Sequence, residues 1–253
     1  MNDDLLRTAI EKRIKYGNDA KFAPYLIRKS IKIFGAQSVS NFRPTIAKWV
    51  YDHYCSEKSD VLDPCLGYGG RLFGAYCSKK VKKYVGVDPS NDTCDNNVEL
   101  SNILNSHLKK NFDSEKEIKI INKPFEDWTT EEKFDLVFTS PPYFDTEHYT
   151  DFDNTQSYVR YPEYKVWVMK FLTPLIINSF KYLNDGGYFI LNVGQKNRNN
   201  LYKDTIRVGS LIFGNPIDIY HMRLSRIMGG KQNSKGHKTE PLIIWQKNSL
   251  LIK

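Results

Sequence analysis

Apolar residues are arranged in two ways along this chain, in short runs and at helical spacing, and segments of the two types alternate. Short continuous apolar runs are typical of buried strands, whereas apolar residues three and four positions apart are typical of amphipathic helices. The runs predict strands over residues 60–63, 84–87, 118–121, 134–139, 188–193, 217–222 and 242–245. The helical spacing predicts helices over 44–54, 71–77, 91–108 and 163–183, the last of them closed by a turn at 184–187.

Strands that alternate with helices indicate a mainly parallel sheet, because parallel strands need crossover connections that then cover both faces. We therefore expect a Rossmann-like α/β domain with a mainly parallel, seven-stranded sheet over residues 41–253. Residues 1–40 also have helical spacing, interrupted by Gly17 and Pro24, and are expected to form an N-terminal helical extension. The length of 253 residues suits one large domain.

The charge balance adds a candidate partner to this picture. The chain carries 37 Lys and Arg against 29 Asp and Glu, a formal net charge of +8. Such a surface attracts polyanions, and phosphate attraction supplies most non-specific affinity for nucleic acid. Charge alone leaves an ordinary solvated surface as an equal alternative.

Three classes of feature are not expected. Residues 1–13 are acidic and then mixed in charge, unlike a signal peptide. No apolar run approaches the roughly 20 residues that span a bilayer. The four cysteines, at positions 55, 65, 77 and 94, are too widely spaced for a Cys-x-x-Cys metal site. We expect a cytoplasmic protein without membrane or metal, in a bacterium or in a cell infected by a phage or virus.

A glycine loop follows the first predicted strand and precedes a helix. It reads Asp63-Pro64-Cys65-Leu66-Gly67-Tyr68-Gly69, and glycine lets a backbone approach a ligand closely where open sheets place their ligands. Asp88 ends the next strand about 20 residues further on, which suits hydrogen bonding to ribose hydroxyls. An ordinary tight turn is the alternative. The glycines do not complete Gly-x-Gly-x-x-Gly, so a dehydrogenase is the weaker interpretation.

A second segment, Ser140-Pro141-Pro142-Tyr143, follows the strand at 134–139. Together with the Asp63 loop it resembles the amino-methyltransferases of DNA, whose members carry Asp, Asn or Ser before Pro-Pro-Tyr or Pro-Pro-Phe after the fourth strand. The Ser form is similar to the cytosine-N4 enzymes, while Asp or Asn more often marks adenine-N6 enzymes. The resemblance implies a class I methyltransferase fold, S-adenosylmethionine as cofactor, and methylation of an exocyclic base amine in DNA, with cytosine N4 favoured.

Physical chemistry explains why such residues suit this reaction. An amine conjugated to its ring becomes a better nucleophile if acceptors hold its hydrogens and turn its lone pair toward the methyl group. The Ser140 hydroxyl and the Pro141 carbonyl are candidate acceptors, Pro142 stiffens the backbone, and Tyr143 offers a face for an extruded base. The alternative is that this proline-rich segment only ends the strand and has no role in catalysis.

The resemblance also implies cofactor contacts elsewhere in the chain. Phe42, Arg43 and Pro44 resemble the segment that closes over the methionine part, which Asp63, Cys65, Gly67 and Gly69 would line. Asp88 and Pro89 would lie at the ribose, Phe125 and Glu126 at the adenine, and Ser140 at the methyl group. Many relatives have Phe at the position of Cys65, so packing against the cofactor is expected to differ. Core packing is an equal alternative for Phe125.

Nucleic acid is expected to contact two polar segments. The loop after Tyr143 supplies Phe144 and His148, and the basic stretch near the end supplies Arg223, Arg226, Lys231 and Lys235. The alternative for the first segment is a loop packed against the sheet, and the alternative for the second is a solvated turn. Because no sizeable recognition region is evident, a specificity subunit or a paired endonuclease is an expected partner. Adenine-N6 methylation, RNA base-amine methylation and a non-catalytic, cofactor-binding subunit on DNA stay open as alternative functions.

Overall fold

The computed structural model describes residues 7, 10, 11, 41–144, 155–194, 200–223 and 239–248. The chain divides into two compact units, Met1–Ser40 with Glu147–Tyr149, and Asn41–Thr146 with Thr150–Lys253. In the first unit, Arg7, Ile10 and Glu11 are helical. The rest of the expected N-terminal extension lies outside the described residues, so the domain boundaries stay a prediction.

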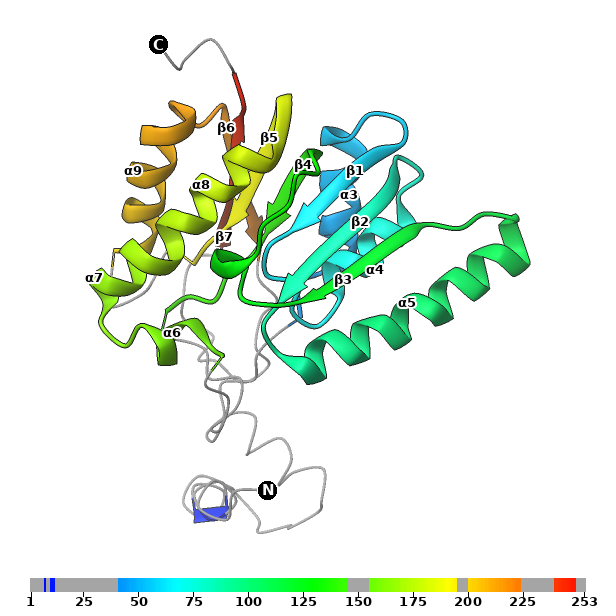
Figure 1. Cartoon of the computed structure of the whole chain (residues 1–253), viewed down its shortest axis with the longest axis horizontal. Coiled ribbons are helices and arrows are strands. Elements are labelled where there is room, and N and C mark those ends of the chain that lie inside the picture. Colours follow the sequence, from blue (N-terminus) through cyan, green and yellow to red (C-terminus); the bar gives the residue numbers. More distant parts are fainter. Residues whose placement is uncertain are drawn as a thin grey trace. The chain divides into compact units, whose positions relative to one another are not determined.

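Within the described residues, seven strands form one sheet in the order β3-β2-β1-β4-β5-β7-β6 (Figure 1). The strands are β1 (Ser59–Asp63), β2 (Val81–Asp88), β3 (Glu117–Asn122), β4 (Phe134–Thr139), β5 (Leu183–Asn192), β6 (Asp218–Arg223) and β7 (Thr239–Gln246). Neighbours among β1 to β5 are parallel, whereas β7 is antiparallel to both β5 and β6. The expected mainly parallel sheet is thus confirmed, with a mixed edge.

The helices of this unit connect the strands and mostly match the expected segments. They are α3 (Pro44–Tyr54), α4 (Gly70–Cys77), α5 (Asn91–Phe112), α6 (Ser157–Arg160), α7 (Tyr164–Trp167), α8 (Thr173–Tyr182) and α9 (Leu201–Phe213). A π-helical turn, Val168–Leu172, joins α7 to α8, so the long predicted helix at 163–183 is one continuous helical segment. The helices α6 and α9 were not expected from the sequence. No described helix is long and apolar enough to cross a membrane.

The turn predicted at residues 184–187 is wrong, because these residues belong to β5. The Gly186 N–H donates to the Lys247 carbonyl at 2.9 Å, and the Lys247 N–H donates to the Gly187 carbonyl at 2.8 Å. These backbone bonds prolong the strand pairing. Gly186 still has φ +79°, a left-handed value that glycine adopts without strain.

Two hydrophobic cores lie on the two faces of the sheet, and successive strand residues alternate between them. Leu62 and Val137 belong to one core, while Val61 and Leu136 belong to the other. The first core contains residues of α8 and α9, and the second contains residues of α3 and α4. Burial on both faces explains why apolar residues are adjacent in the central strands, as at Val61 and Leu62 in β1 and at 136–138 in β4.

The order of the strands determines where a ligand site can form. From β1 the chain moves outward through β2 to β3, and it then returns to the other side of β1 with β4. The connections after β1 and β4 therefore diverge at the carboxyl edge of the sheet. Open α/β sheets bind their ligands in the crevice at such a reversal.

Candidate active site

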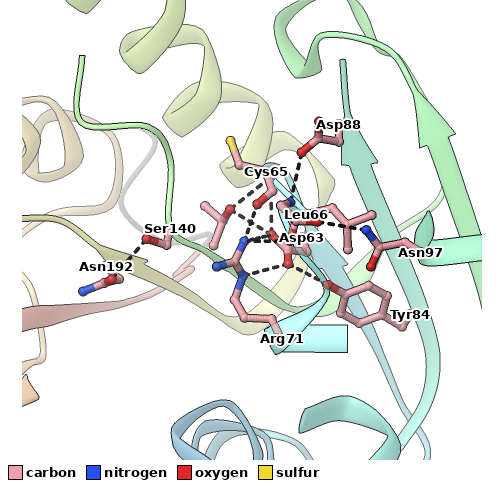
Figure 2. Close-up of polar contacts among 12 residues, drawn as sticks. Asp63, Cys65, Leu66, Arg71, Tyr84, Asp88, Asn97, Ser140 and Asn192 are labelled. Atoms are coloured by element: carbon pink, nitrogen blue, oxygen red, sulfur yellow. Dashed lines mark hydrogen bonds and ion pairs between the residues drawn. The ribbon is translucent and has the colours of Figure 1, made fainter. Parts of the chain in front are cut away.

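The carboxylate of Asp63, at the end of β1, is fully buried and bonded on all sides (Figure 2). Arg71 of α4 donates from Nε to Oδ2 at 2.7 Å and from Nη2 to Oδ1 at 3.2 Å. The Tyr84 hydroxyl donates to Oδ2 at 2.6 Å, and the Thr139 hydroxyl donates to Oδ1 at 2.9 Å. Burial and the Asp63 charge raise the pKa of Tyr84, so that its hydroxyl remains a donor. Protein donors thus occupy the carboxylate that was expected to line the methionine part of the cofactor.

Arg71 also fixes the glycine loop. Its Nη2 donates to the carbonyl of Cys65 and, at 3.3 Å, to the carbonyl of Leu66. Its guanidinium lies 5.4 Å from the centroid of the Phe42 ring, in a cation–π contact. Arg71 was not expected at the site, because no local sequence pattern shows that this arginine faces inward toward Asp63.

The glycine loop takes backbone conformations that only glycine adopts readily. Gly67 has φ +58° and Gly69 has φ +78°. A Cβ atom on Gly69 would lie 2.5 Å from Oδ1 of Asn97, whereas one on Gly67 would meet nothing closer than a carbonyl oxygen at 3.9 Å. Gly69 therefore packs against α5, while Gly67 leaves open space at the carboxyl edge.

Asp88 lies beside this loop, at the end of β2 and half-buried. Its Oδ2 accepts the N–H of Gly67 at 2.9 Å, and its Oδ1 accepts the N–H of Ser90 at 3.0 Å. Burial raises the pKa of Asp88, and the two N–H donors oppose that shift. The structure thus joins Asp88 to the glycine loop, although its role at a ribose stays a prediction. The neighbouring Pro89 carbonyl accepts from Asn122 at 3.4 Å.

The segment before α3 reaches the same loop. Asn41 accepts the N–H of Gly70 at 3.1 Å and donates to the Tyr68 carbonyl at 3.0 Å. The Phe42 ring packs edge-on against Phe138, with centroids 5.4 Å apart. Arg43 precedes α3, and Pro44 is the first residue of that helix. The predicted closing segment therefore lies against the glycine loop.

Cys65, at the start of the loop, is half-buried. Burial, together with the charges of Asp63 and Asp88, raises the pKa of its thiol, which therefore stays protonated. Its N–H donates to Thr139 Oγ1 at 3.0 Å. Among the described residues, no group of His, Cys, Asp and Glu side chains is arranged to hold a metal ion.

The expected adenine contacts have other partners in the structure. Phe125 is buried and packs against Trp128 and Tyr182, with ring centroids 5.9 and 6.1 Å away. The Glu126 carboxylate forms an ion pair with Arg160 at 2.6 Å. Phe125 therefore packs in the core, as the alternative interpretation has it, and an adenine contact there stays a prediction.

Ser140 directly follows β4 and is half-buried. Its hydroxyl is bonded to Asn192 of β5. Ser140 Oγ donates to Asn192 Oδ1 at 3.1 Å, and the Tyr143 hydroxyl donates to the same oxygen at 3.1 Å. The Tyr143 oxygen also lies 3.3 Å from Glu240 Oε2, so its single proton is shared between these two acceptors. In Figure 2, the Ser140–Asn192 pair lies on one side of the Asp63 network and Asp88 on the other.

Two aromatic residues expected to meet a base are packed inside the protein. Tyr143 is 9% exposed and Phe144 is 7% exposed. Phe144 packs edge-on against Tyr164 and Trp167, with centroids 5.3 and 5.7 Å apart. Their rings therefore belong to the first core, and the expectation that they offer a stacking face to a base stays a prediction.

The expected basic contacts are only partly visible. Arg223 ends β6 and is exposed. His148, Arg226, Lys231 and Lys235 lie outside the described residues. Nucleic-acid contact by these five residues stays a prediction.

Comparison with known proteins adds to this geometry. Residues 134–252 match a family model described as DNA methylase, and this range begins at β4 and includes Ser140. No curated protein sequence matches the chain. The partial family match supports methyltransferase activity.

Solved structures show the fold. A methyltransferase from Pyrococcus furiosus is 13% identical, with 97% of each chain covered and a TM-score of 0.52. A putative RNA methyltransferase from Pyrococcus horikoshii is 13% identical, with 81% of this chain and 83% of that chain covered and a TM-score of 0.52. A 16S rRNA N2 G1207 methyltransferase from T. thermophilus, in complex with AdoMet and guanosine, is 14% identical. The match covers 85% of this chain and 45% of that chain, with a TM-score of 0.50. The fold is that of the class I methyltransferases.

Replacing Arg71 by methionine tests the role of the buried ion pair. Arg71→Met leaves the Asp63 carboxylate buried without its counter-charge, which costs about 3–5 kcal/mol in the free energy of unfolding. Urea denaturation measures this loss. The control is Lys48→Met, which breaks an exposed ion pair with Asp52 and is expected to change stability by about 1 kcal/mol or less. Equal losses in the two variants would contradict the assigned role.

Proposed function

We propose that this chain transfers a methyl group to the exocyclic amine of a nucleic-acid base, with cytosine N4 in DNA favoured. Its cofactor is S-adenosylmethionine. The class I fold and the partial match to a DNA methylase family support the general reaction. The finer choice of base rests on Ser140, since the Ser form of the segment is similar to the cytosine-N4 enzymes.

The position of Ser140 is the observation that carries this proposal. The residue follows β4 at the reversal of strand order, next to the loop that follows β1. It is half-buried at the carboxyl edge of the sheet. An acceptor in such a place can hold an N–H of the amine and direct the nitrogen lone pair.

The residues around the glycine loop fit the cofactor. Asp88 presents a carboxylate at the carboxyl edge, where ribose hydroxyls can donate to it. Because Gly67 has no side chain, the space next to its Cα is open to a ligand. S-adenosylmethionine supplies a methyl group whose bond to sulfur breaks as the bond to the amine nitrogen forms. The methylated nitrogen then loses its extra proton to solvent, and the chain therefore needs no dedicated base.

The choice between DNA and RNA is part of the proposal. The net charge of +8 suits either polyanion. The family description favours DNA, whereas two proteins of similar fold are named as enzymes of RNA. RNA base-amine methylation is therefore the second candidate. A specificity subunit or paired endonuclease remains the proposed protein partner. The acceptor segment is intact in this chain, which argues against a non-catalytic subunit.

Methyl transfer from labelled cofactor tests the proposal directly. The purified protein is incubated with labelled S-adenosylmethionine and, separately, with duplex DNA, single-stranded DNA and RNA, and the products are digested to nucleosides for mass spectrometry. We expect label in N4-methylcytosine from DNA. Label in N6-methyladenine or in RNA would replace the substrate assignment. Cofactor binding without any label would contradict catalysis by this chain alone.

The Ser140→Ala variant tests the acceptor. Loss of the hydroxyl is expected to slow methyl transfer by on the order of 10²-fold while leaving cofactor affinity unchanged. Single-turnover kinetics and calorimetry measure the two quantities. Ser106→Ala, at an exposed site on α5, serves as the matched control. A variant as fast as the wild type would remove Ser140 from the reaction.

The raised pKa of Asp88 predicts how cofactor binding depends on pH. The ionised carboxylate accepts ribose hydroxyls, so affinity should fall as pH drops through its raised pKa, above the usual value for Asp, about 3.9. A raised folded-state pKa means that protonating Asp88 does not itself favour unfolding. Asp88→Asn should weaken binding by roughly 10-fold and remove this pH dependence. Calorimetry across pH measures both effects, with Asp113→Asn as the control. Unchanged affinity would refute the assignment.

A further inference from the structure

We infer that Asn192 is a positioning residue that fixes the direction of the Ser140 hydroxyl, so that Ser140 meets the substrate as a hydrogen-bond acceptor. The inference rests on the proposed function and adds a residue that the sequence analysis did not find. Asn192 ends β5, next to β4 in the sheet, and is 1% exposed. Its side chain is therefore shielded from water and bonded only within the protein.

The orientation of the Asn192 amide follows from its other partner. Its Nδ2 donates to the backbone carbonyl of Pro241 in β7 at 3.0 Å. A carbonyl oxygen only accepts hydrogen bonds, so the NH₂ group must face Pro241. The Oδ1 atom must then face the opposite way, toward the segment that follows β4. The pairing of β5 with β7 places Asn192 opposite Leu242, one residue after Pro241, which holds this arrangement in the sheet.

The amide oxygen in turn determines where the Ser140 proton lies. Oδ1 is an acceptor, and Ser140 Oγ is 3.1 Å from it, so the single hydroxyl proton of Ser140 is donated to Asn192. The Tyr143 hydroxyl lies 3.1 Å from the same oxygen and 3.3 Å from Glu240 Oε2, and its single proton is shared between these two acceptors. Ser140 keeps its own lone pairs as its remaining capacity for hydrogen bonding.

This polarity matters for a nucleophilic amine. A serine hydroxyl that is free to rotate can donate its proton to the amine nitrogen, which occupies the lone pair that must attack the methyl carbon. With its proton held by Asn192, Ser140 can only accept an N–H from the amine. The arrangement therefore selects a substrate group that has N–H bonds to donate, and it leaves the nitrogen lone pair available for attack.

A double-mutant cycle tests whether Asn192 acts through Ser140. In single-turnover assays, Asn192→Ala should slow methyl transfer by about 10-fold with unchanged cofactor affinity. In a Ser140→Ala background the same substitution should add less than about a twofold loss, because the group it orients is gone. The control is Asn184→Ala, at the other end of β5, where the side chain bonds to Asp135 instead; it should leave the rate unchanged.

Three results would overturn the inference. Equal losses from Asn192→Ala in the two backgrounds would show that Asn192 acts independently of Ser140. An unchanged rate in the single variant would show that it plays no part. If the alanine variant does not fold, Asn192→Leu, of similar volume, takes its place in the cycle. A neutron structure of the deuterated wild-type protein gives a reading that needs no activity: we expect the Ser140 deuteron to point at Asn192 Oδ1. A deuteron pointing elsewhere refutes the inference, whereas an inactive wild-type protein refutes the proposed function instead.

Discussion

The buried ion pair between Asp63 and Arg71 is the interaction on which the candidate site depends. Asp63 gathers donors from α4, β2 and β4, and the backbone carbonyl of Arg71 accepts the Tyr51 hydroxyl of α3 at 3.1 Å. Two buried charges are costly unless their geometry is good and their remaining hydrogen-bonding capacity is filled. Here both conditions hold, and the same contacts fix the backbone of the glycine loop.

This network separates groups that hold the site from groups that can act in it. Asp63 has all its acceptor capacity filled by protein donors, so it serves as a scaffold although it lies in the most recognisable part of the loop. Asp88 and Ser140 are only half-buried and lie on either side of that scaffold. In our account Asp88 serves the cofactor and Ser140 serves the substrate amine, with Asn192 directing the Ser140 proton. Tyr143, by contrast, connects β4 to β5 and β7 through its hydroxyl.

Local patterns in the sequence were sufficient for much of the fold. The bounds of β4 and α3 follow directly from a mostly apolar segment and from Pro44 at the start of a helix. The helix α9 was missed although Leu201, Thr205 and Val208, which it buries, have helical spacing. The turn at 184–187 was wrong because pairing with Lys247, far away in the sequence, overrides the local glycine signal.

The same limit applied to the site. The two segments that carry recognisable motifs, at Asp63 and at Ser140, were found from sequence, and the structure brings them to one edge of the sheet. Arg71 and Asn192 were not found, because each acts through contacts between distant segments. The burial of Tyr143 and Phe144 likewise depends on tertiary packing, which no short motif encodes.

A crystal structure of the chain with S-adenosylhomocysteine, the product left after methyl transfer, tests the central claim most directly. Our account predicts that the ribose hydroxyls lie within hydrogen-bond distance of Asp88, beside Gly67, and that the sulfur is directed toward Ser140. A ligand bound elsewhere would contradict it, for example in the groove of about 630 Å³ that Tyr164, Met169 and Leu211 help to line.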